Sequence, residues 1–327
     1  MIMSKIKNIS LLMNKRAINR CLRRFSHVRW NIVFPFLLFC RGIRVRKKRL
    51  KSIFNILKTK SCVTSIRLSS TDTVSLVCDY AFYKFPLTED SDKRIIAEFE
   101  NWKVAREIKE TLIIPDVEII KNDQVLYLKM PLLQVIPEKN RTQSYSYVLN
   151  SFYSQKALSK TEMTDDIKHG CEIIKHLDFS DHHESFIIDF ENRWLNIKAY
   201  RSTTHGDLHP GNIMQINGKF VLIDMDRFEM NGFTGFDLIH LYLQIMETNI
   251  KGWMPRLKEI TTEEISVTLN TEVFDSYSTQ EWNIFKTAYW IDRIGKEQKY
   301  GDKFTPALRE QTRSMLSFVK AQWINNV

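Results

Sequence analysis

The spacing of hydrophobic and polar residues changes several times along the chain. Up to about residue 60, apolar residues recur every three or four positions among lysines and arginines, a spacing typical of an amphipathic basic helix. After Ser61, short alternating runs predict antiparallel strands over 63–68, 74–77 and 81–85. A helix is predicted from Asp92, then a hairpin over 117–128, and helical spacing dominates from about Gln143. We therefore expect a small antiparallel sheet followed by a larger, mainly helical region.

Composition limits the size of the hydrophobic core, and the cysteines indicate the redox compartment. The 327 residues are 43% hydrophobic and 26% charged, which suits one two-lobed domain or two small domains. Cysteines are odd in number, scattered and without C-x-x-C spacing: Cys21, Cys40, Cys62, Cys78 and Cys171. This pattern favours a reducing compartment and argues against a disulfide framework or a structural zinc site.

The net charge of +10 is concentrated in one segment. Residues 1–60 carry 17 of the 48 Lys and Arg and none of the 38 Asp and Glu. The rest of the chain therefore has 31 basic against 38 acidic residues and is mildly acidic. Such asymmetry indicates an anionic partner for the N-terminal arm and not for the remainder.

The sequence leaves several possible functions of this N-terminal arm open. Its apolar stretch, 32–39, is too short to span a bilayer and contains Pro35, and a second basic block follows over 41–51. An apolar wedge with clustered cations suits an anionic membrane surface, so we expect a cytoplasmic protein that rests on the inner face of a membrane. A transit peptide and helices packed on the small lobe are the alternatives. Nucleic acid is not the expected partner, and flanking arginines argue against a secretory signal.

One cluster of residues indicates the chemistry. His205-Gly206-Asp207-Leu208-His209-Pro210-Gly211-Asn212 is followed by two short apolar runs around Gly218 and then by Asp224. A hairpin of that length would bring Asp224 back beside Asn212. One carboxylate could then accept the proton of an attacking hydroxyl, while an amide oxygen and a second carboxylate hold Mg²⁺ against ATP phosphates.

This stretch resembles the aminoglycoside phosphotransferase and choline kinase-like family, which usually reads H-G-D-x-H-x-x-N. The match is specific from His205 to Leu238 and diffuse over the rest of 61–327. The resemblance implies an α+β, two-lobed protein kinase-like fold, divided into a basic extension (1–60), a nucleotide-binding lobe (61–132) and a catalytic lobe (133–327). It also implies roles for four residues: Asp207 as catalytic base, Asn212 and Asp224 as magnesium ligands, and Asp237 as the structural aspartate behind the catalytic loop.

The resemblance also assigns the nucleotide contacts. In the kinase arrangement the third strand carries a lysine that reaches the ATP phosphates and pairs with a glutamate of the next helix. Lys84 is the sole lysine of that strand, and Glu98 is its expected partner, with Glu100 as the alternative. Ser70 lies in a loop without glycine, whose hydroxyl and N–H groups would hold phosphates, and Met130 lies in the expected hinge beside adenine.

The acceptor remains open. Asp237 follows Asp224 by thirteen positions, and no A-P-E segment is present to dock a peptide, so a small hydroxylated molecule is expected. A sugar of a surface glycan, of lipopolysaccharide or capsule type, would suit an enzyme at the membrane. An aminoglycoside would require acidic residues such as Glu259, Glu263, Glu264 and Asp275. Choline or ethanolamine would require an aromatic cage, but Trp282, Phe285, Tyr289, Trp290 and Trp323 have the helical spacing more typical of a core.

The sequence thus predicts ATP-dependent phosphorylation of a hydroxyl group with Mg²⁺. Asp226 either assists a second metal ion or is a surface carboxylate, and His205 and His209 are expected to brace the loop by hydrogen bonds. An inactive kinase-fold scaffold is the alternative from another class. Its signature would be loss of the lysine, the base or a metal ligand, and all of these are retained.

Overall fold

The computed structural model describes residues 47–58, 63–68, 72–78, 80–108, 114–122, 125–153, 156–176, 183–246, 250–299, 310 and 312–317. Residues 1–46, which make up most of the predicted basic arm, lie outside the described part, as do Ser70 and Trp323. Within the described part, every helix is too short or too polar to cross a bilayer.

The N-terminal lobe is built on a five-stranded antiparallel sheet with strand order β1-β2-β3-β5-β4. All five strands were expected from the alternating pattern. Their bounds are β1 (Val63–Leu68), β2 (Thr73–Cys78), β3 (Ala81–Pro86), β4 (Glu118–Asn122) and β5 (Val125–Pro131).

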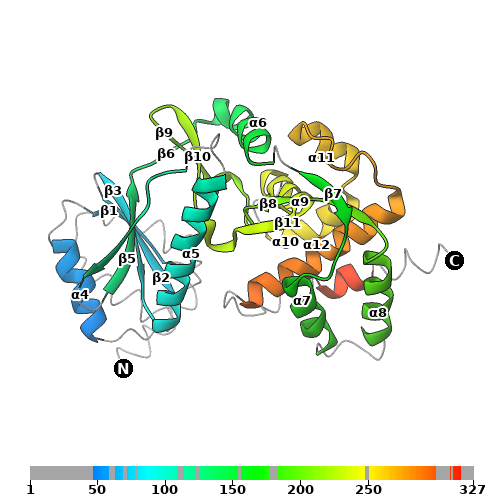
Figure 1. The fold of residues 1–327 in the computed structure, drawn as a ribbon, viewed down its shortest axis with the longest axis horizontal. Helices are drawn as coiled ribbons and strands as arrows, with labels where there is room; N and C mark the ends of the chain where they lie inside the picture. The colour runs from blue at the N-terminus through cyan, green and yellow to red at the C-terminus, as the bar shows by residue number, and fades with distance from the viewer. Residues whose placement is uncertain are drawn as a thin grey trace, which may run out of the picture.

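Alternation along the strands gives this sheet two different faces. Side chains such as Leu76, Phe85 and Tyr127 form one buried apolar cluster with helix α4 (Lys47–Lys58). Lys84 occupies the alternate position of β3 and therefore belongs to the other face, on the side of helix α5 (Glu89–Ile108). Figure 1 shows α4 and α5 on opposite faces of the sheet, with α5 toward the C-terminal lobe. The apolar side of the sheet is thus closed by α4, and the polar position faces the other lobe.

Helix α4 is the part of the predicted basic arm that the structure describes. Ile53 and Ile56 are buried against the sheet, and the Arg49 guanidinium makes two contacts of 2.8 and 2.6 Å with the Asp92 carboxylate at the start of α5. Ile53 and Ile56 are therefore committed to the protein core and are not free to enter a membrane. The domain bounds at residues 60 and 132 remain predictions.

The two lobes are joined after β5. This strand continues to Pro131, so most of the segment expected as a hinge, 129–132, is strand, and only residues 132 and 133 separate it from β6 (Gln134–Val135). Strand β6 pairs with β9 (Ile213–Ile216), which in turn pairs with β10 (Lys219–Leu222). The hairpin that follows the predicted catalytic loop is thereby hydrogen-bonded to the chain that leaves the first lobe.

The C-terminal lobe is mainly helical. A second small sheet, in the order β11-β8-β7, supports the chain on either side of the catalytic loop. Its strands are β7 (Ala157–Lys160), β8 (Lys198–Thr204) and β11 (Glu229–Phe233). The helices are α6 (Arg141–Phe152), α7 (Asp165–Lys175), α8 (His183–Trp194), α9 (Thr234–Met246), α10 (Ile250–Glu259), α11 (Thr262–Leu269) and α12 (Thr279–Lys299). The architecture is thus α+β and two-lobed, as the sequence predicts.

The aromatic residues of α12 belong to the core of this lobe. Trp282, Phe285, Tyr289 and Trp290 are all at least 96% buried. Phe285 packs against Trp194 and Phe236 with ring centroids 5.8 and 5.1 Å apart. The expectation that their helical spacing reflects core packing is confirmed, and these four rings do not form a cage open to a cationic ligand.

Helices α7 and α12 pack at a very close approach through glycine. A Cβ atom added to Gly170 would lie 2.1 Å from the carbonyl oxygen of Ile291, and one added to Gly295 would lie 2.0 Å from that of Asp166. Because both obstacles are backbone atoms, a side chain at either position can be accommodated only if the helices separate.

We expect Gly170→Ala to destabilise the protein by about 1–3 kcal/mol, since overpacking costs of this order arise when helices are forced apart. Thermal unfolding should show a Tm lowered by roughly 3–10 °C. His169→Ala, at an exposed position of the same helix, is the control and should leave the Tm within about 2 °C. An unchanged Tm for Gly170→Ala would show that the helices are not packed this closely.

Candidate active site

The predicted catalytic loop begins where β8 ends, and its backbone is fixed by a buried carboxylate. Asp237, in the first turn of α9, accepts hydrogen bonds from the N–H of His205 (2.6 Å) and of Gly206 (2.9 Å). The hydroxyl of Tyr153 donates to the same carboxylate at 2.6 Å. Burial raises the pKa of Asp237, and these donors oppose that shift. Asp237 therefore lies where a structural aspartate behind the loop is expected.

Gly206 makes the turn of this loop possible. Its φ is +77°, in the left-handed region that glycine enters without steric cost. A Cβ atom here would lie 2.1 Å from the carbonyl oxygen of Arg227. The loop thus passes directly over the segment that follows Asp224, and no other residue type fits at this position.

His205 ties the catalytic loop to the segment that carries Asp224. Its Nδ1 accepts from the N–H of Asp207 at 3.3 Å, so Nε2 carries the ring proton and donates to the carbonyl of Ile223 at 2.8 Å. The Nδ1 of His209 accepts from the N–H of Gly211 at 3.0 Å within the same loop. Both histidines make the bracing hydrogen bonds expected of them.

The hairpin brings Asn212 and Asp224 together, as the spacing predicted. Leu222 pairs with Ile213, and the N–H of Ile223 donates to the carbonyl of Asn212 at 2.9 Å. The Asn212 amide donates from Nδ2 to the carbonyl of Asp207 at 3.0 Å, which fixes the plane of the amide. No contact to its Oδ1 is found among the described residues, so that oxygen can serve as a ligand.

Lys84 connects the two lobes. Its Nζ lies 2.8 Å from Oε2 of Glu98 on α5 and 2.9 Å from Oδ1 of Asp224 in the C-terminal lobe. The expected contact with Glu98 is therefore present, whereas Glu100 pairs with Lys103 on the exposed side of α5. One ammonium group thus joins the sheet, the helix and the segment after β10.

Opposite charges keep Lys84 and Asp224 ionised. Burial favours the neutral amine, but the Asp224 and Glu98 carboxylates outweigh it and hold the pKa of Lys84 well above its usual value. Burial likewise favours a protonated Asp224, and Lys84 more than offsets this, so the pKa of Asp224 is lowered. At neutral pH the structure therefore presents an ionised carboxylate at position 224.

A second contact from α5 fixes the segment around Asp224. The Asn101 side chain, one turn after Glu98, donates to the carbonyl of Met225 at 2.8 Å. Asp224 itself has a φ of +66°, which is uncommon for a residue with a side chain and is held by these surroundings. Helix α5 therefore orients both the lysine and the strained residue that the lysine contacts.

The acidic groups around Asp224 fit a divalent cation. Burial, followed by the charge of Asp224, raises the pKa of Asp226 to about 8, and a bound cation would favour the ionised form of this carboxyl group. Among the described residues, no three Asp, Glu, His or Cys side chains gather into a complete metal site. Mg²⁺ typically needs only one or two carboxylates, with phosphate oxygens and water completing its shell. Asn212 and Asp224, with Asp226 close by, supply such a partial set.

Asp207 is surrounded by cationic and polar groups that the sequence did not single out. Its Oδ1 lies 2.8 Å from Arg293, 3.2 Å from Nε2 of His240 and 3.9 Å from Arg227. Burial would raise the pKa of Asp207, but Arg293 and Arg227, followed by His240, lower it well below the usual range. Asp207 is thus a fully ionised carboxylate.

These residues were missed because their contacts are distant in sequence. Arg293 lies 86 positions after Asp207, and no spacing rule links them. A weak signal existed for His240 and Arg293, since each interrupts the apolar face of a helix that is otherwise buried. Tyr153 gives no such signal.

Of the two remaining residues predicted to contact the nucleotide, the structure describes Met130 but not Ser70. Met130 is buried on β5 opposite Phe82, on the same face of the sheet as Lys84, whose partner on β5 is Leu128. This position suits a residue that packs against adenine. Ser70 lies outside the described residues.

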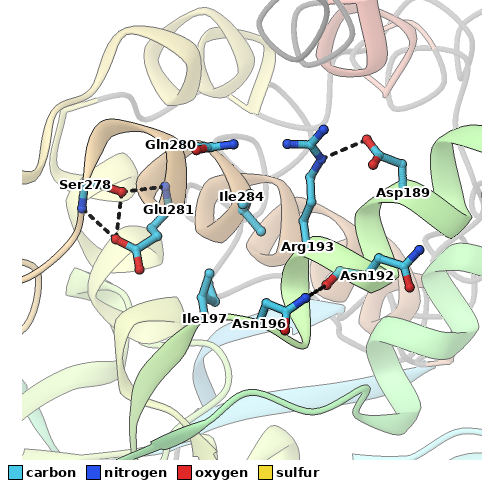
Figure 2. A pocket seen from close by; sticks show the side chains of 9 residues that line it. All are labelled: Asp189, Asn192, Arg193, Asn196, Ile197, Ser278, Gln280, Glu281 and Ile284. Atoms are coloured by element: carbon cyan, nitrogen blue, oxygen red, sulfur yellow. Dashed lines mark hydrogen bonds and ion pairs between the residues drawn. The ribbon is translucent and has the colours of Figure 1, made fainter. Parts of the chain in front are cut away.

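A pocket of about 610 Å³ lies away from this cluster, between the end of α8 and the start of α12 (Figure 2). Its polar side chains are engaged with one another, as when Arg193 contacts Asp189 at 2.9 Å and Asn196 donates to the carbonyl of Asn192 at 2.7 Å. None of the predicted site residues lines this pocket. The chemistry therefore places the candidate active site at the lobe junction and not here.

Comparisons with known proteins identify the fold. No protein-family model and no curated protein sequence matches the chain. Among solved structures, the choline kinase LicA from Streptococcus pneumoniae is similar, with a TM-score of 0.52, 16% identity, and coverage of 84% of this chain and 98% of that one. The aminoglycoside phosphotransferase APH(2")-IIa bound to gentamicin has a TM-score of 0.52 at 14% identity, and the match covers 84% of this chain and 96% of the other.

The same phosphotransferase in a ternary complex with streptomycin and ATP gives a TM-score of 0.51 at 14% identity, covering 81% of this chain and 95% of the other. The matched region spans nearly the whole length of each of these structures. At such identities the likeness establishes the arrangement of the chain in space. The chain therefore has the two-lobed, protein kinase-like fold seen in choline kinase and aminoglycoside phosphotransferase structures, as its sequence motif predicted.

Proposed function

We propose that this protein is an ATP-dependent phosphotransferase that phosphorylates a hydroxyl group of a small molecule or of a glycan sugar. The observation that carries the proposal is the double ion pair of Lys84, which joins Glu98 of the first lobe to Asp224 of the second. Two residues far apart in sequence thereby meet beside a catalytic loop held by Asp237. Such an arrangement is the one that phosphoryl transfer from ATP requires.

Different residues would bind different parts of the phosphate donor, ATP. Lys84, oriented by Glu98, would bind the phosphates of ATP, for which its permanent positive charge is suited. Met130 would pack against the adenine, and the loop that contains Ser70 would contact phosphate oxygens. Asn212 and Asp224 would hold Mg²⁺, which neutralises charge on the transferred phosphoryl group.

Asp207 would act on the acceptor. Its carboxylate accepts a hydrogen bond from the acceptor hydroxyl and orients the oxygen toward the γ-phosphorus. As the new P–O bond forms and the bond to the leaving ADP oxygen breaks, the hydroxyl proton passes to Asp207 and then to solvent. A carboxylate with a lowered pKa is a weak base, so the proton moves late, when the hydroxyl oxygen is already bonding to phosphorus.

Two features bear on the acceptor class. The four aromatic residues of α12 that could have formed a choline cage are buried in the core, which weakens the choline proposal. Of the acidic residues considered for an aminoglycoside, Glu264 is occupied by the capping box of α11 and by Arg256, and Asp275 accepts from Ser266. We therefore favour a neutral or anionic acceptor such as a glycan sugar. Labelled ATP with fractionated host extract, followed by mass identification of the product, would test this choice.

Asp207→Asn removes the proton acceptor and should lower phosphate transfer by about 10²–10⁴-fold, while ATP affinity stays within a few-fold. Transfer of label from γ-labelled ATP to the acceptor measures the first quantity, and titration with a fluorescent ATP analogue measures the second. Transfer retained within a few-fold would refute the role of Asp207.

Asp224→Ala should act on donor binding instead, because it removes a proposed metal ligand and one partner of Lys84. We expect Mg·ATP affinity to fall at least about tenfold, in the range found when a group that supports a metal site is lost. Titration of ATP with and without Mg²⁺ checks this, and an equal affinity for Mg·ATP in both proteins would contradict the assignment. Glu100→Ala, which alters an exposed carboxylate of α5, is the control.

Residues 1–46 are proposed to hold the protein on an anionic membrane surface from the cytoplasmic side. The full chain should then float with vesicles that contain phosphatidylserine, and a chain lacking residues 1–46 should not. A chain lacking residues 1–60 should in addition have a lower Tm than the shorter truncation, because it loses the buried Ile53 and Ile56 of α4. Flotation that survives removal of residues 1–46 would contradict the membrane role of this arm.

A further inference from the structure

The two carboxylate oxygens of Asp207 have different surroundings. Arg293, His240 and Arg227 all approach Oδ1, at 2.8, 3.2 and 3.9 Å. Within the described part of the chain, Oδ2 has no hydrogen-bonding or ionic partner, and it is not among the buried polar atoms that lack a partner. One oxygen is therefore held by the protein, and the other is accessible.

The groups that hold Oδ1 come from two helices outside the catalytic loop. Arg293 lies on α12 and His240 on α9, and the His240 side chain is almost completely buried. Nδ1 of His240 lies 3.0 Å from the hydroxyl of Tyr289, which can donate to it. In that tautomer Nε2 carries the proton and faces Oδ1 of Asp207 at 3.2 Å, outside the geometry of a hydrogen bond. Burial, followed by the charge of Arg293, lowers the pKa of His240 to about 4, so the ring lies against Asp207 as a neutral group at physiological pH.

Helix α12 contributes twice to this arrangement. Tyr289 and Arg293 are four residues apart and so lie on the same face of the helix. One turn of α12 thus supplies the guanidinium that contacts Asp207 and the hydroxyl that orients His240. The helix is fixed two residues later, where Gly295 meets the backbone of α7. The position of Oδ1 is therefore set by the packed core of the C-terminal lobe.

Such a contact matters because an aspartate carboxylate turns easily about its terminal bond. A carboxylate that can turn presents either oxygen and spends part of its time misdirected. A hydrogen bond from Arg293 and the close approach of the His240 ring to the same oxygen restrict this rotation and leave the second oxygen at a defined place. Misplacement of a reacting group by about 1 Å can cost on the order of 10²-fold in rate.

We propose that Arg293 and His240 are positioning residues for Asp207, which hold Oδ1 so that Oδ2 is the oxygen presented to the acceptor hydroxyl. The inference rests on the proposed phosphotransferase function for its kinetic consequence. The geometry it describes belongs to the protein without substrate. It can therefore be tested both with and without turnover.

The kinetic test uses Arg293→Met, Arg293→Lys and His240→Gln, with Arg256→Met as the matched control. Arg256 is also a guanidinium of the C-terminal lobe paired with a carboxylate, Glu264, but it does not contact Asp207. Label transfer from ATP is measured to whichever of three probes the wild-type protein phosphorylates fastest: choline, gentamicin or a lipopolysaccharide preparation. We expect kcat to fall about 10–100-fold in Arg293→Met and His240→Gln, with the KM for ATP within threefold.

Two further variants distinguish a positioning role of Arg293 from a merely structural one: a conservative replacement and a double variant with Asp207→Asn. Arg293→Lys keeps the charge but loses the planar fork, so it should recover only part of the loss. In an Asp207→Asn background, Arg293→Met should cause less than a threefold further loss, because the group it positions is already gone. A loss no greater than in Arg256→Met, or a full second loss in the double variant, would overturn the proposal.

A measurement without turnover keeps the geometry testable if none of the probes is phosphorylated. Ring ¹⁵N signals of His240, identified by their absence in His240→Gln, should show the neutral tautomer with the proton on Nε2 at pH 7. The charged and titratable groups facing this ring are Asp207, Arg293, His209 and Tyr289. Arg293→Met removes a cation, so the pKa of His240 should rise from about 4, whereas Arg256→Met should leave it unchanged. A proton on Nδ1, or a pKa that does not move, would overturn the proposed geometry independently of catalysis.

Discussion

The buried ammonium group of Lys84 is the interaction on which the active-site arrangement depends. A charge removed from water is tolerated only if opposite charges surround it, and Glu98 and Asp224 both approach within 2.9 Å. Because these carboxylates belong to different lobes, the need to neutralise one lysine fixes the lobes with respect to each other. Without Asp224, Lys84 would be paired only within the N-terminal lobe, so the contact that joins the lobes also favours one arrangement of them.

The residues around this ion pair form two groups, one on the side of the phosphate donor ATP and one on the side of the hydroxyl acceptor. On the side of the phosphate donor, Asp224 is ionised and Asp226 has a raised pKa, and a divalent cation would favour ionisation of both. On the acceptor side a single carboxylate, Asp207, lies against two guanidinium groups. The loop between them is held by hydrogen bonds to Asp237 and from His205, which fix how the two sides are placed in this structure. A protein catalyses phosphoryl transfer mainly by positioning the reactants and by stabilising charge, because the reaction needs little covalent participation of the protein.

Much of this arrangement could be predicted from the sequence because it is local. The five strands follow from alternation, and the meeting of Asn212 with Asp224 follows from the length of one hairpin. Glu98 could be preferred to Glu100 because it shares a helix face with buried apolar residues. The groups that surround Asp207 could not be predicted, since Arg293 and His240 reach it through the packing of two helices. The sequence allowed α4 to pack either on the sheet or on a membrane, and its pattern could not decide between them. An apolar helix face suits a protein core and a membrane equally.

The position of α4 changes what the basic extension can do for the protein. Ile53 and Ile56 anchor this helix in the core of the N-terminal lobe, on the face of the sheet opposite α5. Residues 47–58 of the basic extension therefore belong to the lobe itself. A partner that held the protein through α4 would lie on the face of the sheet opposite Lys84, and would leave the side that carries Lys84 turned away from the point of attachment.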